Sequence, residues 1–136
     1  MAKATVAAVV HPATGSRESV LLTRREVSPF KGCWCLPGGH IDDFEPVRDA
    51  VRREVLEETG LDFTPSTFVG WFDEIFPEHR FHAVVLAFSG PGSGTPAAQP
   101  GEVAEIAWFP LDEALAMPLA FNHNLVLQRH ASSLLQ

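Results

Sequence analysis

The chain has 136 residues and a formal net charge of −7, and 46% of its residues are hydrophobic. This length and apolar content are typical of one globular domain with its own core, which we expect to span residues 1–136. The acidic balance disfavours nonspecific binding to nucleic acid or anionic membranes, and no apolar run reaches the roughly 20 residues of a membrane-spanning helix.

The N-terminal segment predicts two strands joined by a turn. Residues 5–10 are apolar and β-branched, which predicts a strand, and the Pro- and Gly-containing residues 12–16 predict a turn. A second strand is predicted at 19–23, and it ends in Arg24 and Arg25. Because side chains alternate along a strand, these arginines point to opposite faces, so at most one is expected to reach a shared site.

A loop is predicted at 28–32, and it is followed by Cys33 and Cys35. A structural zinc site needs about four ligands, and no second pair of Cys or His has suitable spacing. Both thiols are therefore expected to pack on one face of a strand as small apolar side chains. The next residues, 36–39, read Leu-Pro-Gly-Gly and predict a turn that brings backbone carbonyls close to a cation.

A helix of about 14 residues is predicted from near Pro46 to Thr59. Pro46 suits the first turn, where its missing N–H is not needed, and Gly60 suits the C-cap. With roughly 3.6 residues per turn, Glu54 lies beside both Glu57 and Glu58, so that the carboxylates share one patch.

The helical wheel places this acidic patch on the side that faces the core. That side also carries Val47, Ala50 and Val51, whereas the opposite side carries Arg48, Asp49, Arg52 and Thr59. Leu56 departs from the pattern and is expected to pack on a second element. The alternative is an ordinary solvated acidic face. However, inward carboxylates are rarely buried unless paired or metal-bound, and oxygen ligands without His favour magnesium or manganese over zinc.

The remainder of the chain alternates between strands, loops and helices. Strands are predicted at 67–75, 81–88 and 105–109, a Gly- and Pro-rich loop at 90–101, and helices at 111–116 and 120–134. Strands interspersed with helices predict an α/β (α+β) fold, in which helices cover both faces of a mixed β-sheet in an α/β/α sandwich.

Residues 39–61 resemble the Nudix box, G-x5-E-x7-R-E-U-x-E-E-x-G-U, where U is a bulky aliphatic residue. The fixed positions are matched by Gly39, Glu45, Arg53, Glu54, Val55, Glu57, Glu58, Gly60 and Leu61. Phe44 stands where many members have Gly. Residues 20–25, 34–37 and 105–110 are also similar to MutT-like members. The resemblance implies the Nudix α/β/α sandwich and hydrolysis of a nucleoside diphosphate linked to a further moiety.

The resemblance also implies roles for the residues of the box. Glu57 and Glu58 would be ligands of Mg²⁺ (or Mn²⁺), together with the carbonyl of Gly39. Glu54 would be a further ligand or the base that deprotonates water. Arg53 would orient a box glutamate instead of binding phosphate. Glu45, about two turns upstream on the helix, would have a supporting structural role through a salt bridge.

Outside the box, the resemblance points to residues whose roles have ordinary alternatives. Glu102 aligns with a metal-binding glutamate of MutT-like members and is a candidate for the general base. Glu105 is a second candidate, and either can also be an exposed loop acid. Arg24 or Arg25 would bind substrate phosphates or be solvated at the strand end. Asn122 falls at a base-reading position, although a lone Asn also suits a helix cap.

The leading hypothesis is a metal-dependent pyrophosphohydrolase that cleaves a nucleoside triphosphate, or a modified one, to monophosphate and pyrophosphate. The alternatives are a hydrolase of a nucleotide sugar, ADP-ribose or dinucleotide, and a catalytically silent nucleotide-sensing Nudix domain. The silent class commonly lacks box carboxylates, which this chain keeps. The N-terminus lacks a signal-peptide pattern, so we expect a cytoplasmic location. We also expect a monomer or homodimer with small-molecule nucleotide substrates and no nucleic-acid or membrane partner.

Overall fold

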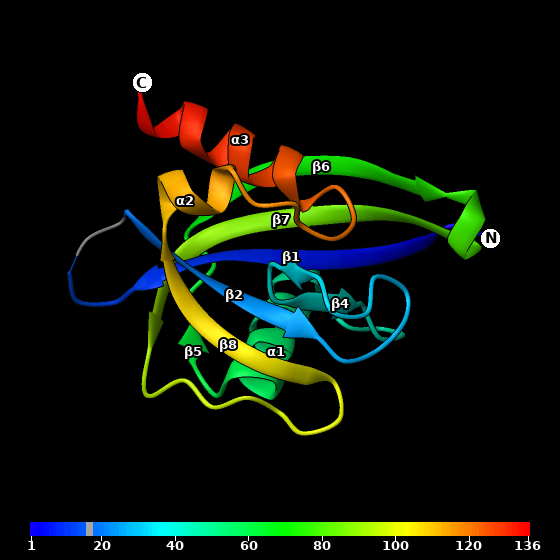
Figure 1. Cartoon of the computed structure of the whole chain (residues 1–136), viewed down its shortest axis with the longest axis horizontal. Coiled ribbons are helices and arrows are strands. Elements are labelled where there is room, and N and C mark those ends of the chain that lie inside the picture. The colour runs from blue at the N-terminus through cyan, green and yellow to red at the C-terminus, as the bar shows by residue number, and fades with distance from the viewer. Residues whose placement is uncertain (16–17) are drawn as a thin grey trace.

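The computed structural model describes residues 1–15 and 18–136, and in this part of the chain the strands form two sheets (Figure 1). The larger sheet contains β1 (Lys3–Pro12), β4 (Gly38–His40), β5 (Asp62–Phe63), β6 (Thr67–Phe76) and β7 (Phe81–Ser93). β1 and β7 are parallel, and the other pairs are antiparallel, so this sheet is mixed. The smaller, antiparallel sheet contains β2 (Ser19–Arg25), β3 (Trp34–Cys35) and β8 (Val103–Pro110).

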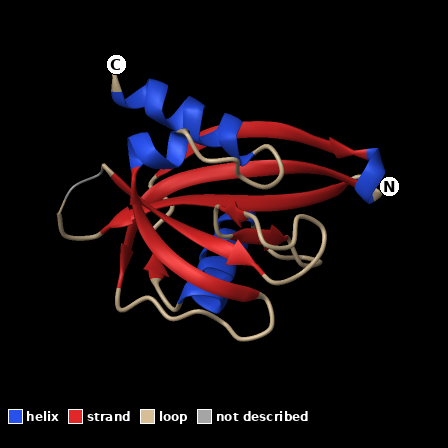
Figure 2. Cartoon of the chain, viewed as in Figure 1, coloured by secondary structure: helices blue, strands red, loops and turns tan. Residues whose placement is uncertain are grey.

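Helices cover the larger sheet from both sides, as the sequence predicted (Figure 2). On one side, α1 (Val47–Thr59) packs with Val6, Ala8 and Val10 of β1. On the other side, α2 (Leu111–Leu115) and α3 (His123–Leu134) pack with Ala7 and Val9. A short 3-10 helix, η1 (Pro77–His79), joins β6 to β7. The alternation of β1 therefore feeds two apolar cores at once.

The predicted strands and helices are confirmed, but glycine misled the prediction at two places. The predicted loop at 90–101 is wrong in its first part, because β7 continues to Ser93 and pairs with β1. A Cβ on Gly90 would collide with the carbonyl oxygen of Thr64. The predicted turn at 36–39 is likewise wrong in its second half, where Gly38 and Gly39 pair with β1 in β4. Glycine in a strand here marks close approach of another backbone.

Helix α1 ends as predicted, with Gly60 in the left-handed conformation at φ 75°. Pro46 precedes the helix as its N-cap residue. Two positions on the wheel are corrected. Thr59 is fully buried. The core can hold its hydroxyl group because that group donates a hydrogen bond to the carbonyl of Val55 at 2.7 Å. Leu56, expected to pack on a second element, is instead 56% exposed.

The remaining predictions meet the structure only in part. Cys35 lies in β3 and is buried, whereas Cys33 precedes that strand and is half-buried. β1 extends to Pro12, the first residue of the turn predicted at 12–16. Ser16, the last residue of that turn, lies outside the described residues. Among the described helices, none has the length and apolar character needed to cross a membrane.

Candidate active site

A cavity of about 490 Å³ opens between the two sheets, beside the first residues of β1. Glu54, Glu58 and Glu102 line it at one side, and Glu74 and His123 line it elsewhere. The cavity therefore brings together carboxylates from α1, β6 and the segment before β8.

Helix α1 aims its glutamates into the cavity because the preceding turns are fixed in the core. Ala50, Val51 and Val55 are fully buried, so the helix cannot rotate without exposing them. Glu54 and Glu58 follow on the neighbouring stripe, one helical turn apart. Only 13% of the Glu54 side chain is exposed.

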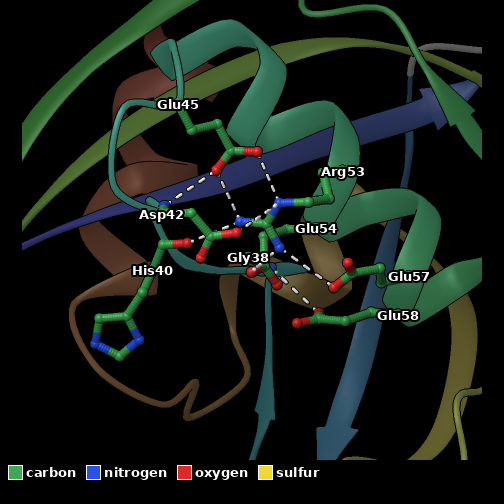
Figure 3. Close-up of polar contacts among 8 residues, drawn as sticks. All are labelled: Gly38, His40, Asp42, Glu45, Arg53, Glu54, Glu57 and Glu58. Carbon is green, nitrogen blue, oxygen red and sulfur yellow. Dashed lines mark hydrogen bonds and ion pairs between the residues drawn. The ribbon is translucent and has the colours of Figure 1, made fainter.

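The two glycines of β4 lie against these carboxylates, and Figure 3 shows Gly38 beside Glu58. The N–H of Gly38 donates to Oε1 of Glu58 at 3.2 Å. Gly39 packs so closely on Glu54 that an added Cβ would lie 2.6 Å from its carboxyl carbon. The Gly-Gly pair thus supports one carboxylate and leaves room for the other.

Burial raises the pKa of both carboxylates. Burial raises the pKa of Glu58 well above its usual value, and the charge of Glu54 raises it further. Burial also raises the pKa of Glu54, although a hydrogen bond from Arg53 opposes the shift. Two acids in one partly desolvated site either retain a proton or attract a cation.

Glu57 does not join this pair. Its side chain is 51% exposed, and its Oε2 atom accepts a hydrogen bond from Nη1 of Arg53 at 3.3 Å (Figure 3). Among residues 1–15 and 18–136, no set of three or more His, Cys, Asp or Glu side chains converges in a way that suits a metal ion. The predicted single patch of three inward acids is therefore corrected to an inward pair, Glu54 and Glu58, because Glu57 turns to the guanidinium beside it.

Arg53 links the box as predicted (Figure 3). Its guanidinium donates to Glu54 at 2.9 Å, to the carbonyl of His40 at 3.0 Å and to Glu45 at 2.7 and 2.9 Å. The salt bridge predicted for Glu45 is confirmed, and the structure shows that its partner is Arg53. Glu45 lies in the loop before α1 and not on the helix. This bond lowers the pKa of Glu45.

Glu102 and Glu105, which follow the Gly- and Pro-rich segment after β7, take different positions. Glu102 lines the cavity, and its charge contributes to the raised pKa of Glu58. Glu105 instead binds Arg24 at 2.8 Å on the surface of the smaller sheet, where both side chains are partly exposed. The pair Arg24–Glu105 does not line the cavity.

Arg25 lines the cavity, in keeping with the predicted alternation along β2. Its Nε donates to the carbonyl of Pro29 at 2.7 Å, and its guanidinium lies 4.9 Å from the ring centre of Phe121. These contacts hold a cation in the lining of the cavity.

Asn122 lies beside the cavity but does not line it. Its side-chain amide donates to the carbonyl of Asp73, and its backbone N–H donates to the carboxyl group of Glu74. Asn122 is the N-cap residue of α3, yet its side chain makes no capping bond. The structure thus commits its amide to backbone support.

Sequence reasoning missed Glu74 and His123. Glu74 is 2% exposed, and burial raises its pKa to about 7. Alternation along the strand could have revealed it, because Phe72 and Glu74 share the inward face. His123 carried no signal, since its partner Leu36 lies 87 residues away.

Comparisons with known proteins agree with this architecture. A sequence model of the NUDIX domain matches residues 1–130. The ADP-ribose pyrophosphatase of Methanocaldococcus jannaschii is 33% identical over 110 residues, which cover 80% of this chain and 63% of that protein. This chain therefore spans slightly less than two thirds of that relative.

Two solved structures are similar over nearly the whole chain. A MutT NUDIX hydrolase from Burkholderia pseudomallei has a TM-score of 0.85 at 30% identity, covering 95% of this chain and 98% of the other. The NUDIX domain of NrtR from Shewanella oneidensis, in complex with ADP ribose, has a TM-score of 0.82 at 28% identity, covering 98% and 89%.

Proposed function

The chain belongs to the NUDIX family, and from this premise we propose that it is a metal-dependent pyrophosphohydrolase of nucleoside triphosphates or their modified forms. The products would be a nucleoside monophosphate and pyrophosphate. The observation that carries the proposal is the inward pair Glu54 and Glu58, half-buried beside a cavity that Arg25 also lines.

The donor set fits a hard divalent cation. Glu54 and Glu58 crowd negative charge into a partly desolvated site, Glu102 adds to it, and the ligands are oxygens. We propose that these residues and the Gly39 carbonyl hold Mg²⁺ (or Mn²⁺), with Glu57 as a further ligand. When bound, such an ion supplies charge stabilisation for the phosphoryl oxygens and a more acidic water.

The protein's own groups would prepare the substrate and the attacking water. Arg53 keeps Glu54 in place through a direct bond and through Glu45, which fixes the guanidinium. Glu54 or Glu102 would accept the proton from water, because both carboxylates border the cavity. Arg25 would bind a phosphate oxygen, since it is the arginine of the Arg24–Arg25 pair that reaches the cavity.

A substrate panel tests the proposal. The purified protein would be incubated with Mg²⁺ and nucleoside triphosphates, modified triphosphates, ADP-ribose, nucleotide sugars and dinucleotides, and the products separated by ion-exchange chromatography. Hydrolysis should release monophosphate and pyrophosphate and should fall by about two orders of magnitude or more in Glu58→Gln. Glu105→Gln, outside the cavity, is the matched control and should retain the wild-type rate.

ADP-ribose hydrolysis is the second candidate, because a relative bears the name ADP-ribose pyrophosphatase and the similar NrtR domain was crystallised with ADP ribose. AMP and ribose phosphate as the main products would favour this candidate over the first. Tight nucleotide binding without any hydrolysis would instead favour a silent sensing domain and reject both enzymatic proposals.

A further inference from the structure

The segment that enters the candidate site is held by the start of α3. Between β3 and β4 the chain crosses from the smaller sheet to the larger one, through Leu36 and Pro37. The N–H of Ala120 donates to the carbonyl of Trp34 at 2.8 Å. The N–H of Leu36 donates to Nδ1 of His123 at 3.0 Å. Two bonds from one short stretch therefore fix the crossing.

The second bond defines the chemical state of His123. Because Nδ1 accepts a hydrogen bond, it carries no proton, and the proton of the neutral ring lies on Nε2. Nε2 faces Oε2 of Glu74 at 3.7 Å, and that buried oxygen has no hydrogen-bond partner. Burial, followed by the charge of Arg25, lowers the pKa of His123 to about 3, so the ring remains a neutral acceptor.

Glu74 is itself fixed in the larger sheet. Its carboxyl group accepts the N–H of Asn122 and, at 3.4 Å, the hydroxyl of Thr5. Contacts from β1, β6 and α3 thus converge on the imidazole that Leu36 uses as its acceptor. Without that acceptor, a buried N–H would lose its partner, which costs about 1–3 kcal/mol.

The crossing leads directly to the carboxylates. Gly38, two residues after Leu36, donates its N–H to Glu58, and Gly39 packs against Glu54. A shift of Leu36 would therefore move the backbone that supports both acids. The carbonyl of Pro37 accepts the N–H of Ala8 at 2.9 Å, which fixes the segment on its other side.

We propose that His123 is a positioning residue: its Nδ1 atom, with Glu74 behind the ring, sets residues 36–39 against Glu54 and Glu58 and thereby sets the affinity of these acids for a divalent cation. The statement about affinity rests on the function proposed above. The statement about the backbone does not, because it concerns contacts present without metal.

The test uses a pair of substitutions at one position. The Oδ1 atom of His123→Asn stands near the place of Nδ1 and can accept from Leu36, whereas His123→Leu has no acceptor. His11→Leu, on β1 and bonded to Pro12, is the control for loss of an imidazole outside the cavity. Thermal melting would verify that each variant is folded.

Two measurements separate positioning from simple stability. Amide hydrogen exchange followed by NMR in metal-free protein should show faster exchange of Leu36 and Gly38 in His123→Leu than in His123→Asn. Mn²⁺ titration followed by electron paramagnetic resonance should show about tenfold weaker binding in His123→Leu, as for other residues that orient ligands, and recovery in His123→Asn.

The outcomes differ for the two proposals. Wild-type Mn²⁺ affinity in His123→Leu, with unchanged exchange of Gly38, would overturn the positioning role. If the wild type binds no Mn²⁺, the proposed function fails, and the exchange rates alone decide about His123. If His123→Leu does not fold, the ring tautomer of the wild type, measured by imidazole nitrogen NMR, decides: a proton on Nδ1 would exclude an acceptor for Leu36.

Discussion

At the scale of single residues, the site is defined by carboxyl groups that the fold has taken out of water. The pKa values of Glu54 and Glu58 are both raised, chiefly by burial. The Glu57 side chain, on the same helix, is 51% exposed and lies beside Arg53. Glu74 is a further buried acid, which β6 contributes. Burial thus raises the pKa of Glu54, Glu58 and Glu74, whereas the hydrogen bond from Arg53 lowers that of Glu45.

Glu74→Gln should change how stability depends on pH. The pKa of Glu74 is raised from 4.5 to about 7 in the folded protein. Between these values the unfolded chain has released the proton that the folded chain retains, so the free energy of unfolding falls as pH rises through this window. At about 1.4 kcal/mol per unit, the loss approaches about 3 kcal/mol.

Glutamine does not ionise, so the variant should melt at a higher temperature than the wild type at about pH 8, with a smaller difference or a reversal at about pH 5. Thermal melts in a chelator at both values measure this. Glu105→Gln, partly exposed in its pair with Arg24, is the control. A difference between Glu74→Gln and wild type that is the same at both pH values would contradict the shift.

At the scale of elements, the site is a contact between helix α1 and strand β4. The helix supplies the acids, and the strand supplies the backbone that supports them. Both glycines of β4 are needed for this close approach, but for different reasons. A Cβ on Gly38 would collide with the carbonyl oxygen of Val6, whereas a Cβ on Gly39 would meet the carboxyl group of Glu54.

Gly38→Ala and Gly39→Ala should therefore separate folding from activity. Backbone cannot yield easily, so Gly38→Ala should lower the free energy of unfolding by about 1–3 kcal/mol or more. The end of a glutamate side chain can move, so Gly39→Ala should remain folded but displace Glu54 and lose at least about tenfold in activity.

Melting curves and turnover of the two variants with the same substrate measure these effects. A Gly39→Ala protein with the wild-type rate would show that the placement of Glu54 against β4 is unimportant for hydrolysis. Equal destabilisation of both variants would show that the two glycines serve one packing role.

At the scale of the whole molecule, metal binding should stabilise the fold. A ligand of the native state raises the free energy of unfolding, by about 2.7 kcal/mol at a concentration of 100 times the dissociation constant. Mg²⁺ or Mn²⁺ should therefore raise the melting temperature of the wild type over that in a chelator.

Glu58→Gln and Glu57→Gln are a matched pair for this measurement. In a chelator, Glu58→Gln should melt above the wild type, because an amide replaces a buried carboxylate that Glu54 repels. Glu57→Gln should change little, because that side chain is half exposed. Added metal should stabilise the Glu58 variant least. A rise in Glu58→Gln as large as that of the wild type would contradict the placement of the cation beside Glu58.

The amino-acid sequence alone determined the family, the layer architecture and the limits of α1, and it predicted a salt bridge for Glu45 without naming the partner. These features depend on local spacing, which residue periodicity and turn chemistry report directly. Tertiary structure decided which side chains meet. Glu57 lies outward beside Arg53, Arg24 pairs with Glu105, and Glu74 and His123 line the cavity. The contacts of Arg24, Glu74 and His123 join residues far apart in the chain, whereas Glu57 lies only four residues from Arg53. Which contact forms depends in each case on packing and desolvation, because these act through the whole fold.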